Sequence, residues 1–138
     1  MTSNKTVFFI IGILLIILGF FMLVPYGVQI FYKEDSHSFL SSSFITILIG
    51  TLFVLANLQD KYELNLKQTF LFSTFTWIAV ALFGSIPFIL SDLNFSLSDS
   101  FFESMSGITT TGSTVITNLD DSPKSILMWR AIMQWLGG

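Results

Sequence analysis

Residues 99–114, reading DSFFESMSGITTTGST, are the stretch whose types and spacing could do chemistry. The stretch begins as a short helix and ends in three threonines, a glycine and Ser-Thr. Threonine is stiff at χ1 and weakly disfavours helix, whereas Gly112 permits backbone angles closed to other residues. A short helix that breaks into extended Thr-Gly backbone between membrane spans can aim carbonyl oxygens at an ion. The alternative is an ordinary polar surface loop.

The helix at the start of this stretch is predicted to cover Asp99–Ser106 and to end at Gly107. Ser100 and Glu103 have the spacing of a capping box, in which serine and glutamate satisfy each other's end of the first turn. About two turns are too few to cross a membrane. The C-terminal end of such a helix carries partial negative charge, so it suits a cation and repels an anion.

No other group of residues points to catalysis. The chain has no cysteine, which excludes a thiol nucleophile and a Cys-ligated metal, and its single histidine, His37, lies in a charged loop. A membrane enzyme would need clustered ionisable residues at membrane depth, and the sequence offers none. No basic cluster is present, which argues against a nucleic-acid partner. We therefore expect neither enzyme activity nor a cofactor.

The composition is that of a membrane protein. Of the 138 residues, 52% are hydrophobic and 11% charged, against about 25% charged in soluble domains. Three apolar segments are each long enough to span the bilayer: Val7–Val24, Phe39–Leu58 and Phe70–Leu90. A cleaved signal peptide competes for the first, but the run is long and lacks a small-residue cleavage site. We expect a retained helix, kinked or ended near Pro25.

A further segment, Lys124–Gly138, reads as the beginning of another span, and we expect the chain to be a fragment that stops within this helix. It contains Arg130, and an arginine in an apolar helix is usually paired or lines water. Snorkelling to the surface is the alternative. The candidate partners are Glu103, Asp120 and Asp121. Irregular backbone at membrane depth is tolerated only where protein buries it or water lines it. Residues 109–113, which we call the Thr-Gly segment, follow a span and a short helix and precede another span. This order favours a segment that lines a pore.

Two motifs carry a resemblance to a known family. The segment FFESMSGITTTGSTVI, followed by LDDSPKSILMWRAIMQWLGG, resembles the first pore repeat of the TrkH-type membrane subunit in the Trk/Ktr/HKT superfamily of potassium transporters. The two earlier spans are similar to the helix pair that precedes the pore repeats in that branch. The resemblance covers essentially the whole chain.

The resemblance implies an all-α membrane protein of potassium-channel-like architecture, in which four helix–pore loop–helix repeats surround one pore. Here, residues 1–68 would form the N-terminal helix pair and residues 69–138 the first pore repeat. Within that repeat we expect an outer helix at 70–90, a pore helix at 99–106, a filter strand at 109–113 and the incomplete inner helix at 124–138.

The resemblance also implies potassium uptake across the bacterial inner membrane. The carbonyl oxygens of Thr110 and Thr111 would coordinate dehydrated K⁺, with Gly112 as the filter glycine. The remaining implied site residues are Thr109 and Ser113, which flank the filter, and Glu103 and Arg130, which brace the pore helix. A single glycine per strand, without the Gly-Tyr-Gly of potassium channels, suggests a filter shorter than theirs, with weaker selectivity against sodium.

The expected partners are the lipid bilayer, a second copy in a homodimer, and a cytoplasmic nucleotide-binding subunit of the TrkA type. Lysine and arginine counts tie between the two sides of the membrane, so a cytoplasmic N-terminus rests on the resemblance alone. The main alternative function is a non-conducting fragment or assembly subunit that needs partner repeats. Four identical copies building one filter are a further alternative.

Overall fold

The structure, a computed structural model, describes residues 4–138, and every regular element in that range is helical. The elements are α1 (Lys5–Phe21), α2 (Leu23–Phe31), α3 (Ser38–Ala56), α4 (Leu66–Leu90), α5 (Leu97–Ile108), the 3₁₀ turn η1 (Leu119–Asp121) and α6 (Lys124–Gly137). The prediction of an all-α fold is confirmed. Three helical stretches are long and apolar enough to cross a membrane: Lys5–Phe31, Ser38–Ala56 and Leu66–Leu90.

The first of these stretches is interrupted at Met22, where α1 ends and α2 begins. Pro25 lies in the first turn of α2. Its ring removes one N–H and clashes with the carbonyl four residues earlier, that of Phe21. The interruption therefore lies three residues before the proline to which the sequence pointed.

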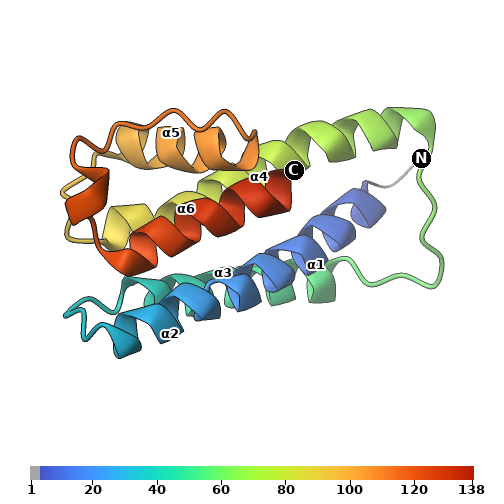
Figure 1. Cartoon of the computed structure of the whole chain (residues 1–138). Coiled ribbons are helices and arrows are strands. Elements are labelled where there is room, and N and C mark those ends of the chain that lie inside the picture. The colour runs from blue at the N-terminus through green and yellow to red at the C-terminus, as the bar shows by residue number, and fades with distance from the viewer. Residues whose placement is uncertain (1–3) are drawn as a thin grey trace.

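Two glycines bring α1 and α3 close together. A Cβ atom added at Gly12 would lie 2.8 Å from the carbonyl oxygen of Gly50, and one added at Gly50 would lie 2.8 Å from the carbonyl oxygen of Gly12. Small residues at such a contact let the backbones of membrane helices approach. Figure 1 shows α1, α2 and α3 as one layer and α4, α5 and α6 as a second layer beside it.

The helix α4 begins four residues before the expected start at Phe70. The reason is a reciprocal cap: the side chain of Asn65 accepts from the Gln68 N–H at 2.9 Å, and the side chain of Gln68 accepts from the Asn65 N–H at 3.0 Å. Such a cap satisfies N–H groups that the first turn leaves unpaired, so the helix extends through the polar residues before the apolar run.

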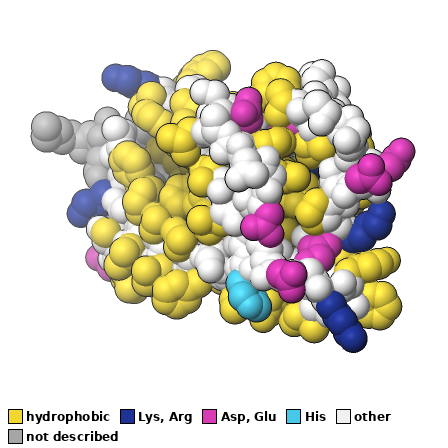
Figure 2. Space-filling view, turned by 90° about the vertical axis from the view of Figure 1, so that its left-hand side faces the viewer, with side chains coloured by type: hydrophobic (Ala, Val, Ile, Leu, Met, Phe, Trp, Pro, Cys, Tyr) yellow, Lys and Arg dark blue, Asp and Glu magenta, His cyan; other side chains and the backbone are white. Residues whose placement is uncertain are grey.

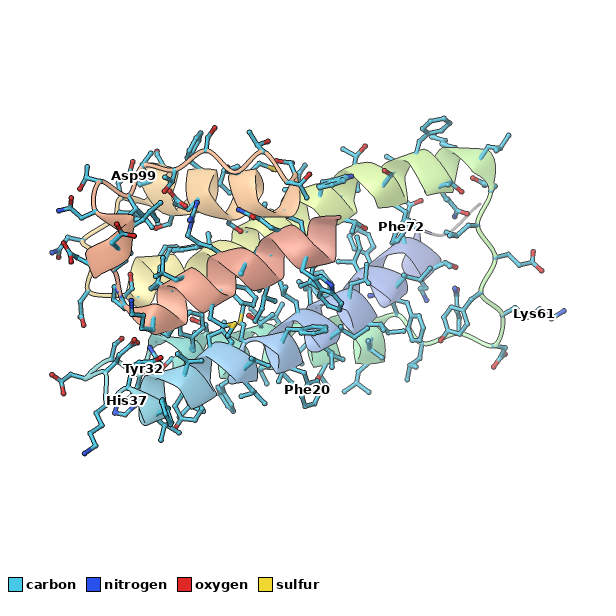
Figure 3. The ribbon with its side chains drawn as sticks, viewed as in Figure 1. Phe20, Tyr32, His37, Lys61, Phe72 and Asp99 are labelled. Atoms are coloured by element: carbon cyan, nitrogen blue, oxygen red, sulfur yellow. The ribbon has the colours of Figure 1, made fainter. Side chains whose placement is uncertain are left out.

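Acidic residues gather at one end of the molecule. The loops that join α2 to α3 and α4 to α5 lie at this end, as does the turn η1 before α6 (Figure 1). Figure 2 views this end directly. In Figure 3, His37 and Asp99 lie at this end and Lys61 at the other. Six of the nine acidic residues belong to it: Glu34, Asp35, Asp92, Asp99, Asp120 and Asp121. His37 is exposed there, as predicted.

Candidate ion-coordinating segment

The helix α5 starts at the acidic end of the molecule and ends part-way along α4 (Figure 1). It begins at Leu97 because Ser96 and Asp99 form a capping box: the Ser96 hydroxyl accepts from the Asp99 N–H at 3.1 Å, and the Asp99 carboxylate accepts from the Ser96 N–H at 3.3 Å. The predicted box between Ser100 and Glu103 is wrong. Both residues lie within the helix and are buried.

The C-terminal end of α5 turns abruptly into the Thr-Gly segment. The helix does not end at Gly107 but continues to Ile108, and Thr110 then adopts a φ of 58°. This left-handed turn lets the N–H groups of Thr111 and Gly112 both donate to the Ser106 carbonyl, at 3.0 and 3.3 Å. Gly112 also has positive φ, 80°. Residues 109–113, predicted as a filter strand, form no regular element but a hydrogen-bonded loop.

The carbonyl oxygens at the two ends of this segment are occupied. The Thr110 hydroxyl donates to the Thr109 carbonyl at 2.7 Å, and the Ser106 hydroxyl donates to the Ser113 carbonyl at 2.6 Å. Between them, the carbonyls of Thr110, Thr111 and Gly112 accept no hydrogen bond from any residue in the range 4–138. Three successive carbonyls are thus left available, and all three residues are exposed.

Glu103, a buried residue of α5, binds the chain just after the Thr-Gly segment. Its side chain is fully buried, with 0% of its surface exposed. One carboxylate oxygen accepts from the Thr114 hydroxyl and from the Val115 N–H, the latter at 2.6 Å. The other accepts from Nε of Arg130 at 3.0 Å. One buried carboxylate therefore joins α5, the chain just after the Thr-Gly segment, and α6.

Arg130 is thus paired rather than snorkelling, and its partner is Glu103 rather than Asp120 or Asp121. Its side chain is 13% exposed. A charge at membrane depth is costly unless it is paired, and Glu103 supplies the opposite charge. Asp120 and Asp121 lie instead in the 3₁₀ turn at the acidic end.

The residue beside Arg130 fixes α6 against α4. The indole N–H of Trp129 donates to the Gly84 carbonyl at 2.9 Å, and Trp129 is fully buried. A Cβ atom at Gly84 would lie 2.6 Å from the Ser104 hydroxyl of α5 and 2.7 Å from Cε of Met133. Close approach at Gly84 thus brings α4, α5 and α6 together behind the Thr-Gly segment.

Chemically, this arrangement offers neutral oxygen ligands. Among the described residues, no three histidine, cysteine or acidic side chains are grouped so that they could hold a metal ion. Carbonyl dipoles of this kind can replace part of the hydration shell of a monovalent cation.

Comparison with known proteins identifies the family. A family model described as TrkH, cation transport protein, matches residues 35–138. The chain belongs to the TrkH family. It is 37% identical over 136 residues to the Trk system potassium uptake protein TrkH of Vibrio parahaemolyticus, and 36% identical over 131 residues to TrkH of Escherichia coli strain K12. These alignments cover 97% and 94% of this chain but 28% and 27% of the relatives.

A solved structure agrees with this assignment. The crystal structure of the potassium transporter TrkH from Vibrio parahaemolyticus matches with a TM-score of 0.93 at 36% identity, over 99% of this chain and 30% of that one. This TrkH-family chain is therefore a membrane protein, and it spans under a third of the length of the relatives it matches.

Two contributors to the site were not found from the sequence. The Ser106 hydroxyl secures the Ser113 carbonyl, and Thr114 binds Glu103. The signal was present, because Ser106 occupies the last turn of the predicted pore helix. Which carbonyl it reaches depends on the turn at Thr110, and residue type alone does not reveal that turn.

Proposed function

We propose that this chain is part of a protein that carries potassium ions across a membrane, and that the carbonyls of Thr110, Thr111 and Gly112 are K⁺ ligands. The observation that carries the proposal is the set of three successive unpaired carbonyls at the end of α5. These carbonyls are exposed in the described chain. Where further repeats of the full-length protein exclude bulk water, such carbonyls need a partner, and a dehydrated cation is a fitting one. We choose potassium as the ion because the relatives are named as potassium uptake proteins.

In the proposed mechanism, four such segments from four repeats surround the ion, and each contributes its carbonyls from one side. The occupied carbonyls of Thr109 and Ser113 hold the two ends of the segment, so the middle three keep their direction when the ion leaves. Glu103 and Arg130 brace the segment and do not contact the ion. Ligands held in place in this way need little rearrangement to replace water.

We propose that the acidic end of the molecule faces the outside and that the N-terminus lies in the cytoplasm of a bacterial cell, at the inner membrane. Carboxylates around a pore mouth raise the local concentration of cations. The partners we propose for the full-length protein are a second copy of itself and a nucleotide-binding subunit of the TrkA type.

The test uses the full-length protein in liposomes, with K⁺ flux and its competition by Na⁺ as readouts. Gly112→Ala is the key variant, because φ there is 80° and no atom lies within 4 Å of an added Cβ. The cost is therefore backbone strain of about 1–2 kcal/mol, and we expect apparent K⁺ affinity to fall about tenfold with normal membrane abundance. Gly27→Ala is the control, since its Cβ also meets nothing. Unchanged flux and selectivity in Gly112→Ala would contradict the proposal.

A further inference from the structure

The N-terminus of α6 has no cap of its own. Pro123 occupies the N-cap position and forms no side-chain cap hydrogen bond. The first N–H groups of a helix have no partner within the helix, and the positive end of the helix dipole favours a carboxylate. A partner from elsewhere in the chain would therefore both fix and stabilise this helix.

Glu34 supplies that partner from 91 residues earlier in the chain. One of its carboxylate oxygens accepts from the Ser125 N–H at 3.2 Å, and the other accepts from the Ser125 hydroxyl. Both donors lie in the first turn of α6. Hydrogen bonds that involve an ionised group are about twice as strong as neutral ones, so this contact is a substantial part of what holds the start of α6.

The loop that carries Glu34 is itself ordered by a buried amide. The Glu34 N–H donates to the Gln29 carbonyl at 2.9 Å, and the Gln29 side chain donates to the Ser38 hydroxyl at 3.1 Å. Gln29 and Ser38 are both buried. The end of α2 and the start of α3 thus hold the loop in the position that presents the carboxylate to α6.

A second contact from the N-terminal helix pair reaches the next turn of α6. The rings of Phe39 in α3 and Trp129 in α6 meet edge to face, with centroids 6.0 Å apart, and both side chains are fully buried. Trp129 donates to α4 on its other side. The first two turns of α6 are therefore held between the N-terminal helix pair and α4.

We propose that Glu34 is a positioning residue for the Thr-Gly segment, residues 109–113: it acts on the geometry of this segment through other residues and does not touch it. It sets the start of α6. One turn further on, Arg130 binds Glu103, and Glu103 binds the Val115 N–H just after the Thr-Gly segment. The N-terminal helix pair thereby takes part in the geometry of the filter. This inference rests on the proposed function for its transport readout, but its structural readout is independent of that function.

The experiment compares Glu34→Ala with Asp35→Ala in the full-length protein. Asp35 is the adjacent carboxylate, is exposed, and forms no side-chain hydrogen bond or ion pair within residues 4–138. The first readout is the ratio of K⁺ to Na⁺ transport, which does not depend on how much protein reaches the membrane. We expect Glu34→Ala to change the ratio by about twofold to about thirtyfold, the range for residues that act on a site without touching its ligand. Asp35→Ala should leave it unchanged.

The second readout is amide hydrogen exchange in residues 109–115. Exchange there should be at least twofold faster in Glu34→Ala than in Asp35→Ala. Glu34→Gln, which keeps the length and an acceptor oxygen, should lie in between and serves where Glu34→Ala fails to fold. Ser125→Ala should act in the same direction, and combining it with Glu34→Ala should add little, because both remove one contact.

The transport ratio and the exchange rate together decide whether Glu34 positions the Thr-Gly segment. A changed ratio and faster exchange support the inference. Reduced abundance with an unchanged ratio and unchanged exchange would make Glu34 a stabilising residue only and overturn it. If the unaltered protein carries no K⁺, the proposed function fails, and exchange at residues 109–115 still decides whether Glu34 positions the segment.

Discussion

Two helix contacts in this molecule differ in the interaction that dominates each of them. Where α1 meets α3, two glycines bring the backbones together, and close packing holds the contact. Where α5 meets α6, a buried carboxylate binds an arginine, a hydroxyl and a backbone N–H. The contact between α1 and α3 is mainly close packing, to which the Ser43 hydroxyl adds a bond to the Gly19 carbonyl at 2.7 Å. Both are regular helices, whose backbone groups are already paired. The helices α5 and α6 also approach closely, at Gly107 and Gly137. The α5–α6 contact must also hold an irregular segment, and only directed polar bonds can orient single peptide groups.

The largest expected effect comes from Glu103→Gln, which breaks the polar contact. Removing one partner of a buried ion pair leaves the other charge uncompensated, at a cost of about 3–5 kcal/mol. We expect a loss in the free energy of unfolding near the lower value, because Arg130 is partly exposed. Denaturant titration of the detergent-solubilised full-length protein would measure it.

Glu63→Gln is the matched control, because Glu63 lies in the exposed loop before α4. Adding Arg130→Gln to Glu103→Gln should recover part of the lost stability, since no unpaired charge remains. Equal effects of Glu103→Gln and Glu63→Gln would show that the buried contact does not stabilise the fold.

A smaller loss is expected from Gly12→Ala, which breaks the packed contact. The added Cβ would meet backbone atoms of α3, the Gly50 oxygen at 2.8 Å and the Val54 nitrogen at 2.9 Å, so the helices must separate. Overpacking of this kind costs about 1–3 kcal/mol. The same denaturant titration should show this loss. The ratio of K⁺ to Na⁺ transport, measured in liposomes, should be unchanged. Gly27→Ala, with open space around its Cβ in α2, should instead gain about 0.5–1 kcal/mol from the lower entropy cost of alanine in a helix. A shifted K⁺ to Na⁺ ratio in Gly12→Ala would mean that the two contacts are coupled.

The smallest expected effect is that of Thr110→Gly, which should raise the free energy of unfolding where Glu103→Gln and Gly12→Ala lower it. Thr110 is β-branched and held at a φ of 58°, a conformation that costs an ordinary residue about 1–2 kcal/mol. Thr110→Gly removes that strain but adds about 0.5–1 kcal/mol of backbone entropy cost, and water can replace the exposed bond from its hydroxyl to the Thr109 carbonyl. The free energy of unfolding should therefore rise by at most about 1.5 kcal/mol. Transport should become less selective. Thr109→Gly, at a residue with ordinary helical φ, should only destabilise. A loss of stability in Thr110→Gly would show that the turn is unstrained.

The sequence predicted the parts of this fold that repeat along the chain. Long apolar runs placed the three spans, and the Thr-Gly run located the irregular segment. Start positions were less accurate, because polar caps decide them: Asn65 with Gln68 starts α4, and Ser96 with Asp99 starts α5. Gly107 does not end α5, which continues to the buried Ile108. A glycine can continue a helix when the following residue packs well.

Contacts between distant residues could not be obtained from the sequence alone. Three carboxylates were equally plausible partners for Arg130, and only the fold selects Glu103. The contact between Glu34 and Ser125 spans 91 residues, and neither residue type signals it. The first contact depends on how α5 packs against α6 within one layer, and the second depends on how the two helix layers meet. The periodicity of the sequence determines neither.

The short length of α5 also has an electrical consequence. Its 12 residues cover about 18 Å at 1.5 Å per residue, which is more than half of a hydrocarbon core of about 30 Å. If α5 begins at the membrane surface and the proposed function holds, a cation that reaches the carbonyls beyond Ile108 would have crossed roughly half of the membrane potential, worth about 1 kcal/mol per 100 mV. That energy alters occupancy about fivefold. Voltage would thus load or empty this segment without any movement of the protein.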